Sequence, residues 1–219
     1  SPNVYSICED KFGNLWFGTV KGITIYNPKY DINTPQAFVY LNDKNGLPDN
    51  DITCITLLLN DEIWLGTWNS GIIVIRTNEN IYDLIKVSES KERSTLMAGI
   101  ISNIKEEDGL ASDNVLSIYE DKDNNIWIGS LSKGITRYIP ASNLERKQNA
   151  AYGTYKIFSI KKGLFSYAID DILQDREGNI WIASQMGLHK YRGDRFVTYD
   201  ESTGLMNNIV FSILEDSKG

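Results

Sequence analysis

The chain has 219 residues, 42% hydrophobic and 23% charged, a balance typical of a folded globular protein rather than a disordered one. Its formal net charge of −7 opposes binding to a phosphate backbone, so we expect no nucleic-acid partner. The sequence contains no apolar run of about 18 residues, which excludes a membrane-spanning helix within it.

A repeated unit organises the chain, and it is clearest at residues 120–138. This segment has a turn rich in Asp and Asn, an apolar strand centred on Trp127, a glycine turn and a further strand. The pattern recurs around Trp16 and Trp181, and a weaker copy surrounds Trp64. Repeats at this spacing indicate stacked supersecondary units. The units open on Val4, Ile52, Val115, Ile169 and Val210.

Four strands are expected in each complete unit. The first has a small or polar residue at its third place, such as Ser6 or Asp171, which suits an innermost strand with little room near an axis. The second is continuously apolar around its Trp, which indicates burial on both faces. The third follows a glycine turn, and the fourth precedes a Gly-Leu pair.

The sequence therefore predicts an all-β fold, a β-propeller segment of four four-stranded blades plus one extra inner strand. The units span about 4–51, 52–114, 115–168 and 169–209, and a fifth begins at 210–219. The turn before the Trp strand places an Asp where it can bond backbone amides, as at Asp10. Unit two has Leu58 at this place, so we expect its turn to differ.

The repeat pattern Asn-x-Val-x-x-Ile-x-Glu-Asp-x-x-Gly-Asn-Ile-Trp-Ile-Gly-Thr-x-x-Gly-Ile-x-x-Tyr resembles the two-component regulator propeller repeat. The matching residues are 4–26, 46–52, 109–138, 163–191 and 204–216. The resemblance implies the periplasmic or extracellular sensor region of a membrane-bound two-component protein, often one that responds to oligosaccharides. It also implies that further propeller blades and signalling domains of a parent chain are partners. The alternative to further blades in the same chain is a homodimer in which two chains together close the ring.

Catalytic chemistry has few candidates in the sequence. His189 is the single histidine and falls within a third strand, where a structural role is expected. Asp121-x-Asp123-x-Asn125 starts like a calcium loop but lacks the Gly and the Glu that such a loop requires. Cys8 and Cys54 have no metal spacing and are expected to be buried thiols. We therefore predict a non-enzymatic protein with no cofactor and no metal.

The loops between second and third strands and the linkers between units emerge on one face of a four-stranded blade. These segments vary between units, as expected for recognition, and Trp68 is the one Trp outside the repeat position. An aromatic ring beside amide groups suits a sugar, although Trp68 could equally cover a neighbouring blade. The predicted ligand-binding residues are Trp68, Asn69, Lys21, Lys133, Gln185, Asp49, Asn50, Asp51, Asp113, Asn114 and Tyr167.

The expected function is a ligand-binding input module that recognises a carbohydrate or another small polar ligand. One alternative is a propeller-type polysaccharide lyase or glycoside hydrolase, for which Asp170 and Asp171 beside Asp49 and Asp51 are the available carboxylates. Another is a purely structural propeller.

Overall fold

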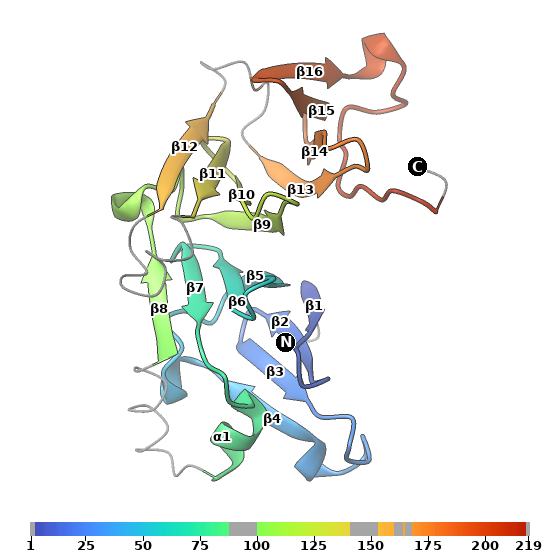
Figure 1. The fold of residues 1–219 in the computed structure, drawn as a ribbon. Helices are drawn as coiled ribbons and strands as arrows, with labels where there is room; N and C mark the ends of the chain where they lie inside the picture. The colour runs from blue at the N-terminus through green and yellow to red at the C-terminus, as the bar shows by residue number, and fades with distance from the viewer. Residues whose placement is uncertain (1–2, 88–99, 141–152, 160–163, 165–167, 218–219) are drawn as a thin grey trace. The chain divides into compact units, whose positions relative to one another are not determined.

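The computed structural model describes residues 3–87, 100–140, 153–159, 164 and 168–217, in which sixteen strands form four antiparallel sheets (Figure 1). Each sheet has four strands in chain order, and we number the sheets blades 1 to 4. Blade 1 contains β1 (Ser6–Glu9), β2 (Leu15–Thr19), β3 (Gly22–Tyr26) and β4 (Phe38–Leu41), and blade 2 contains β5 (Ile52–Leu57), β6 (Ile63–Thr67), β7 (Ile72–Ile75) and β8 (Ile101–Ile104). Blade 3 contains β9 (Val115–Glu120), β10 (Ile126–Ser130), β11 (Ile135–Ile139) and β12 (Thr154–Phe158), and blade 4 contains β13 (Ile169–Gln174), β14 (Ile180–Ser184), β15 (Gly187–Arg192) and β16 (Arg195–Tyr199).

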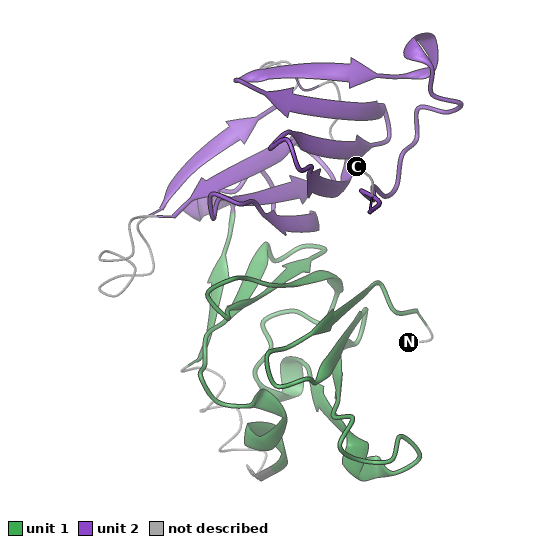
Figure 2. Ribbon diagram, turned by 45° about the vertical axis from the view of Figure 1, so that its right-hand side comes forward, with its two compact units in different colours: residues 1–105 green, residues 106–219 purple. Residues whose placement is uncertain are grey.

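The chain divides into two compact units, residues 1–105 with blades 1 and 2 and residues 106–219 with blades 3 and 4 (Figure 2). The all-β class and the repeating four-stranded sheet are confirmed. The described residues after β16 form a short 3-10 helix, η5 (Glu201–Thr203), and then no strand. An inner strand needs a second strand beside it to complete its ladder, and none lies there among the described residues. The predicted fifth inner strand therefore stays a prediction.

The Trp strands are the buried centres of the blades. Every residue of β6 and β10 is buried, as their unalternating apolar sequence predicts, whereas β2 alternates between buried and half-buried residues. Trp16, Trp64 and Trp127 are each at most 2% exposed, while Trp181 is half-buried. The second strand is thus the part of each repeat that contributes most to the core.

One hydrogen bond closes the turn between the first and second strands. In three blades an indole N–H donates to the Asp six residues before it, at 2.7–2.9 Å; the pairs are Trp16–Asp10, Trp127–Asp121 and Trp181–Asp175. Blade 2 uses Glu62 instead, whose Oε2 accepts from Trp64 Nε1 at 2.9 Å.

The turn of blade 2 differs in its side-chain hydrogen bonds, as expected, but its backbone follows the same path. Asp61 N–H donates to Leu58 O at 2.9 Å, as Gly13 N–H donates to Asp10 O at 3.0 Å. Asp61 adopts the left-handed conformation that Gly13 supplies in blade 1, with φ of 65° against 81°. The side chains that accept hydrogen bonds have changed: Glu62 replaces Asp10 as the acceptor of the indole, and Asn60 Oδ1 accepts a backbone N–H in the blade 2 turn.

Third-place residues of the inner strands tie successive blades together within each unit. Ile55 N–H donates to Ser6 Oγ at 3.0 Å, and Ser117 Oγ donates to Ile169 O at 3.2 Å. Ile213 N–H donates to Asp171 Oδ2 at 2.9 Å. These small polar residues therefore bridge from one inner strand to the segment that follows its blade.

The insertion after β7 contains a helix that was not predicted from the sequence. Helix α1 (Ile81–Val87) starts there, where Asn80 Oδ1 accepts from Tyr82 N–H at 3.1 Å and from Asn14 Nδ2 at 2.9 Å. Asn80 thereby fixes the first turn of α1 to the turn of blade 1. Among the described residues, no helix has the length and apolar character needed to cross a membrane.

Candidate functional site

The linkers between blades are built around one repeated hydrogen bond. The backbone N–H of the first 3-10 residue donates to the side-chain Oδ1 of the residue seven positions later, at 2.8 Å in each of three linkers. The pairs are Asp43–Asn50, Glu106–Asp113 and Glu201–Asn208. Two predicted ligand residues, Asn50 and Asp113, therefore hold their own linkers closed, which engages one oxygen of each side chain.

In unit 1 the structure brings Asp49, Asp51 and Trp68 together. Asp51 N–H donates to Asp49 Oδ1 at 3.0 Å, and Trp68 N–H donates to Asp51 O at 3.0 Å. The side chain of Trp68 is 41% exposed, and Asn69 follows it in the same turn. An exposed ring held by its backbone is a suitable platform for the apolar face of a sugar. Lys21 is exposed on the corresponding turn of blade 1.

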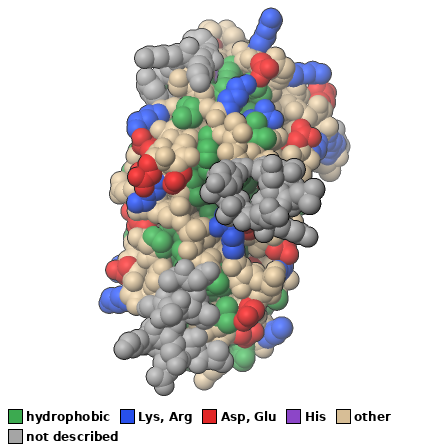
Figure 3. All heavy atoms as spheres, turned by 60° about the vertical axis from the view of Figure 1, so that its left-hand side comes forward, with side chains coloured by type: hydrophobic (Ala, Val, Ile, Leu, Met, Phe, Trp, Pro, Cys, Tyr) green, Lys and Arg blue, Asp and Glu red, His purple; other side chains and the backbone are tan. Residues whose placement is uncertain are grey.

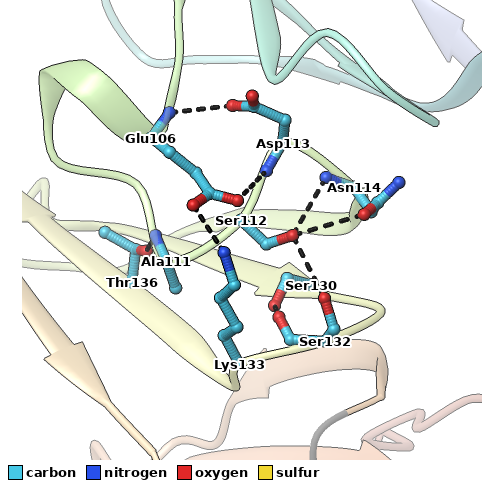
Figure 4. Close-up of polar contacts among 9 residues, drawn as sticks. All are labelled: Glu106, Ala111, Ser112, Asp113, Asn114, Ser130, Ser132, Lys133 and Thr136. Atoms are coloured by element: carbon cyan, nitrogen blue, oxygen red, sulfur yellow. Dashed lines mark hydrogen bonds and ion pairs between the residues drawn. The ribbon is translucent and has the colours of Figure 1, made fainter.

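In blade 3 the predicted residues Lys133 and Asp113 meet at the 3-10 helix η3 (Glu106–Asp108), as Figure 4 shows. Lys133 Nζ lies 2.5 Å from Glu106 Oε2, and Glu106 N–H donates to Asp113 Oδ1. The hydrogen bond from Lys133 lowers the pKa of the Glu106 carboxyl below its usual value. The ion pair between Lys133 and Glu106 holds the Lys133 ammonium against the linker.

The hydroxyl of Ser112 joins the same linker to the β10–β11 turn. Ser112 Oγ accepts from Asn114 N–H at 3.2 Å and lies 3.3 Å from Ser132 Oγ (Figure 4). Asn114 O accepts from Leu131 N–H at 3.0 Å. Asn114 is therefore part of the contact between linker and turn.

Gln185 lines a hollow of about 440 Å³ on blade 4, between the β14–β15 turn and the linker that follows β16. Its other lining residues are Met186, Thr198, Asp200 and Asn208. The amide of Gln185 makes no hydrogen bond to any described residue, and Met186 is 56% exposed. The volume lies in the range of small-molecule sites, and polar groups beside an apolar side chain suit an amphipathic ligand such as a sugar.

The linker after blade 4 is joined to its β14–β15 hairpin by a different hydrogen bond from the one in blade 1. In blade 1 the equivalent linker is held against the turn by a hydrogen bond from Gly22 N–H to Asn50 O at 2.7 Å. Among the described residues no such bond joins Gly187 to Asn208; Val210 N–H donates to Ser184 O instead, at 2.9 Å. Thr198 and Asp200 line the hollow without having been predicted from the sequence.

Of the other residues considered, His189 is completely buried between two hydroxyl groups, Ser184 Oγ at 2.9 Å and Thr198 Oγ1 at 2.8 Å. Burial lowers its pKa to about 4. Asp171 Oδ2 accepts hydrogen bonds from Ser212 Oγ and Ile213 N–H. The pKa of Asp170 is raised, mainly by burial and to a smaller extent by the neighbouring charge of Asp171. Tyr167 lies outside the described residues.

The side chains on the face drawn in Figure 3 are of mixed charge, with Lys and Arg interspersed among Asp and Glu. Among the residues whose positions are described, no group of three or more His, Cys, Asp and Glu side chains is arranged to hold a metal ion.

The family model of the two-component regulator propeller matches residues 1–21, 109–132 and 163–186. The chain carries two-component regulator propeller repeats. The matched segments of these repeats contain the linker residues Asp113 and Asn114 and the turn residue Gln185. Blade 2, in which Glu62 has replaced the turn Asp, lies outside the matched segments.

The chain is also similar to parts of longer proteins. The chain is 27% identical over 211 residues to histidine kinase P4 of Formosa agariphila, covering 94% of this chain and 13% of that protein. The chain thus spans a small part of the length of the curated relative that it matches. Its repeats resemble the solved extracellular domain of a protein named as the hybrid two-component system BT4673 of B. thetaiotaomicron, with TM-score 0.71, 18% identity and coverage of 99% of this chain and 27% of that one.

An enzyme shares the fold as well. Virginiamycin B lyase of Staphylococcus aureus matches with TM-score 0.56 and 14% identity, over 90% of this chain and 55% of that one. At these identities the structural likenesses show the fold alone. Together with the matched repeats, these likenesses support a propeller fold.

Proposed function

We propose that this chain forms part of the extracytoplasmic input module of a two-component sensor, and that its linker-side face binds an oligosaccharide or a similar polar ligand without converting it. The observation that carries the proposal is the hollow on blade 4. Gln185 supplies an amide that makes no hydrogen bond to any described residue, Asp200 a carboxylate and Met186 an exposed apolar surface. The hollow on blade 4 thus brings polar and apolar side chains together on one concave surface.

Trp68 is proposed as a separate ligand contact, on the linker-side turns of unit 1. Its ring is exposed while its backbone N–H is fixed to Asp51 O, so a ligand that stacks on the ring need not first order the turn. Further blades and the signalling domains of a longer parent chain are the expected partners, because the related kinase is much longer than this chain.

An oligosaccharide array tests the proposal with the wild-type chain, with the Gln185→Ala variant and with the Trp68→Ala variant. We expect binding by the wild type. Gln185→Ala should lose at least tenfold in affinity for a glycan bound in the blade 4 hollow, and Trp68→Ala should lose as much for a glycan that stacks on Trp68 in unit 1. Matched controls are Gln36→Ala for the amide and Leu59→Ala for the apolar side chain, because both wild-type residues are exposed and lie away from the linker-side turns. The control variants should bind as the wild type does.

The outcomes separate the alternatives. Unchanged binding in both Gln185→Ala and Trp68→Ala overturns the site assignment. Cleavage of a bound oligosaccharide, detected by mass spectrometry of the recovered glycan, favours the enzyme. If neither this chain nor a longer parent protein binds the array, the proposal fails and a structural role replaces it.

A further inference from the structure

The buried ring of His189 sets the direction of a hydrogen bond at the wall of the hollow. Ser184, the last residue of β14, contacts this ring through its hydroxyl. Ser184 Oγ lies 2.8 Å from Gly187 O, and a carbonyl oxygen only accepts, so the single hydroxyl hydrogen of Ser184 is directed there. Met186 N–H donates to Ser184 Oγ at 3.1 Å.

The other blades show that this use of the hydroxyl is a constant feature of the repeat. At the end of β2, Thr19 Oγ1 donates to Gly22 O at 3.0 Å and accepts from Lys21 N–H at 3.0 Å. At the end of β6, Thr67 Oγ1 donates to Gly71 O at 2.9 Å. The hydrogen of Ser184 is therefore committed to its own turn in the same way.

The tautomer of His189 follows from this commitment. Ser184 Oγ has no second hydrogen, so its 2.9 Å contact with His189 Nε2 requires that the ring nitrogen donates. The ring is completely buried and bonded to neutral hydroxyls alone, and its lowered pKa keeps it neutral at pH 7. A neutral imidazole protonated on Nε2 carries a lone pair on Nδ1.

Thr198 must then supply the other hydrogen. Its Oγ1 lies 2.8 Å from His189 Nδ1, a nitrogen that can only accept, so the Thr198 hydroxyl donates to the ring. Thr198 is half-buried and lines the hollow beside Asp200. With its hydrogen committed inward, Thr198 Oγ1 keeps only acceptor capacity for a ligand.

We propose that Thr198 is a specificity-determining residue of the hollow, which accepts a hydrogen bond from the ligand and cannot donate one. This inference rests on the proposed function. Asp200 Oδ1 already accepts from Ser202 Oγ and Thr203 N–H, so Oδ2 is the carboxylate oxygen left to accept from a ligand. The wall formed by Thr198 and Asp200 therefore selects ligands that present O–H or N–H groups. A ligand whose hydroxyls are capped by methyl groups cannot donate to Thr198 Oγ1 or Asp200 Oδ2 and is rejected. His189 is the positioning residue that fixes this polarity.

The tautomer can be measured without a ligand. Because the sequence contains a single histidine, protein labelled with ¹⁵N-histidine gives the ring signals of His189 alone. Long-range ¹H–¹⁵N correlation spectra at pH 7 should show Nε2 protonated and Nδ1 unprotonated. A ring protonated on Nδ1 reverses the hydrogen bond to Thr198 and overturns the proposal.

The recognition role is tested with an oligosaccharide that binds on the array and with the same oligosaccharide after O-methylation. The wild type should lose at least tenfold in affinity for the methylated probe. Thr198→Val should bind the unmodified probe about tenfold more weakly, whereas Thr198→Ser, which keeps the hydroxyl, should bind it as the wild type does. Equal affinities of Thr198→Val and the wild type overturn the role of Thr198.

Two controls keep these outcomes distinct. The histidine spectrum of Thr198→Val should still show Nε2 protonated, since the bond to Ser184 is unchanged, and a lost or broadened spectrum identifies a folding defect that Thr198→Ser does not share. If the wild type binds no oligosaccharide, the proposed function and the recognition role of Thr198 fail together. The tautomer measurement still decides the hydrogen-bond direction in that case.

Discussion

Trp64 Nε1 donates its hydrogen bond to Glu62 Oε2 at 2.9 Å, where the other three repeat tryptophans donate to an Asp six residues earlier. Glu62 lies two residues before Trp64, at the end of the turn, whereas the Asp of the other blades lies at its start. The side chain of Glu is also longer than that of Asp, and its carboxylate reaches the indole N–H from this position. It also pairs with Arg76, whose Nε is 2.8 Å from Glu62 Oε1. Blade 2 has therefore kept the hydrogen bond while changing the residue that accepts it.

Replacing Glu62 with Ala should lower the free energy of unfolding by about 1–3 kcal/mol, because it leaves the Trp64 indole N–H without an acceptor in a buried position. Urea unfolding followed by tryptophan fluorescence measures the change. Glu79→Ala in the same unit is the control, because Glu79 is exposed and its side chain makes no hydrogen bond to any described residue. Equal stability of Glu62→Ala and Glu79→Ala would contradict the importance of the indole bond.

Installing the common arrangement should compensate for the loss of Glu62. Leu58 occupies the position that Asp10 has in blade 1, and the backbone of the two turns is alike. In a double-mutant cycle, Leu58→Asp and Glu62→Ala should therefore be non-additive, with the double variant about 1 kcal/mol more stable than the sum of the single changes predicts. An additive cycle would show that the two carboxylate positions do not substitute for each other.

The linker bond should tolerate a carboxylate but not an apolar side chain. Asn50→Asp keeps an Oδ1 acceptor for Asp43 N–H, as the natural Asp113 does for Glu106 N–H, but it removes the Asn50 side-chain hydrogen bond that lowers the pKa of the Asp43 carboxyl. The substitution should therefore cost about 0.5 kcal/mol. Asn50→Leu removes the acceptor and should cost about 1 kcal/mol or more. Amide hydrogen exchange at Asp43 gives a local readout, and it should accelerate only in the Leu variant.

The two classes of tryptophan should respond differently to truncation. Trp127 is 1% exposed and packs on Phe158 and Tyr191, so Trp127→Ala should destabilise unit 2 by about 3–5 kcal/mol. Trp68 is 41% exposed, and Trp68→Ala should cost less than about 1 kcal/mol. Thermal unfolding of both variants measures the difference, and a large loss in Trp68→Ala would favour a packing role over a ligand contact.

His189 should make the stability of unit 2 depend on pH. Its folded-state pKa of about 4 lies below the ordinary value of 6.5, so the unfolded chain binds the proton more readily. The stability that the neutral ring contributes is complete above pH 6.5 and is lost as the pH falls toward 4. Between pH 7 and pH 4.5 this amounts to about 2–3 kcal/mol.

Urea midpoints measured at both pH values in the wild type and in His189→Gln isolate this contribution, because the carboxylates titrate in both proteins. The wild type should lose more stability than the variant on acidification. An NMR titration of the single histidine that gives a pKa near 6.5 would rule out the effect.

Much of the architecture could be predicted because the repeat presents the same pattern several times. The Trp strand, the glycine turn and the Gly-Leu linker recur at matching places, so each strand could be assigned by comparison with the other copies. Helix α1 could not be predicted in this way, since it lies in an insertion that no other repeat contains. Its first turn depends on the contact of Asn80 with Asn14, which are far apart in the sequence.

The candidate site was less accessible to sequence reasoning. The linker-side position of Gln185 followed from strand topology, but the polar groups of Asn50 and Asp113 were interpreted as free for a ligand when their linkers use them. The contact of His189 with Thr198 depends on strand register. The two-residue turn Gly193-Asp194 pairs Arg192 with Arg195, and this pairing places Thr198 opposite His189. The contact could therefore have been predicted from the hairpin sequence.

The turn–tryptophan hydrogen bond has a consequence for how such a chain folds. Donor and acceptor are at most six residues apart, so each inner hairpin satisfies its largest buried polar group by itself, before any neighbouring blade has formed. Contacts this local close quickly and cost little chain entropy. Folding can therefore nucleate in whichever repeat forms its hairpin first and spread from there to its neighbours. A chain with this property can lengthen or shorten by whole repeats during evolution without losing its folding nucleus.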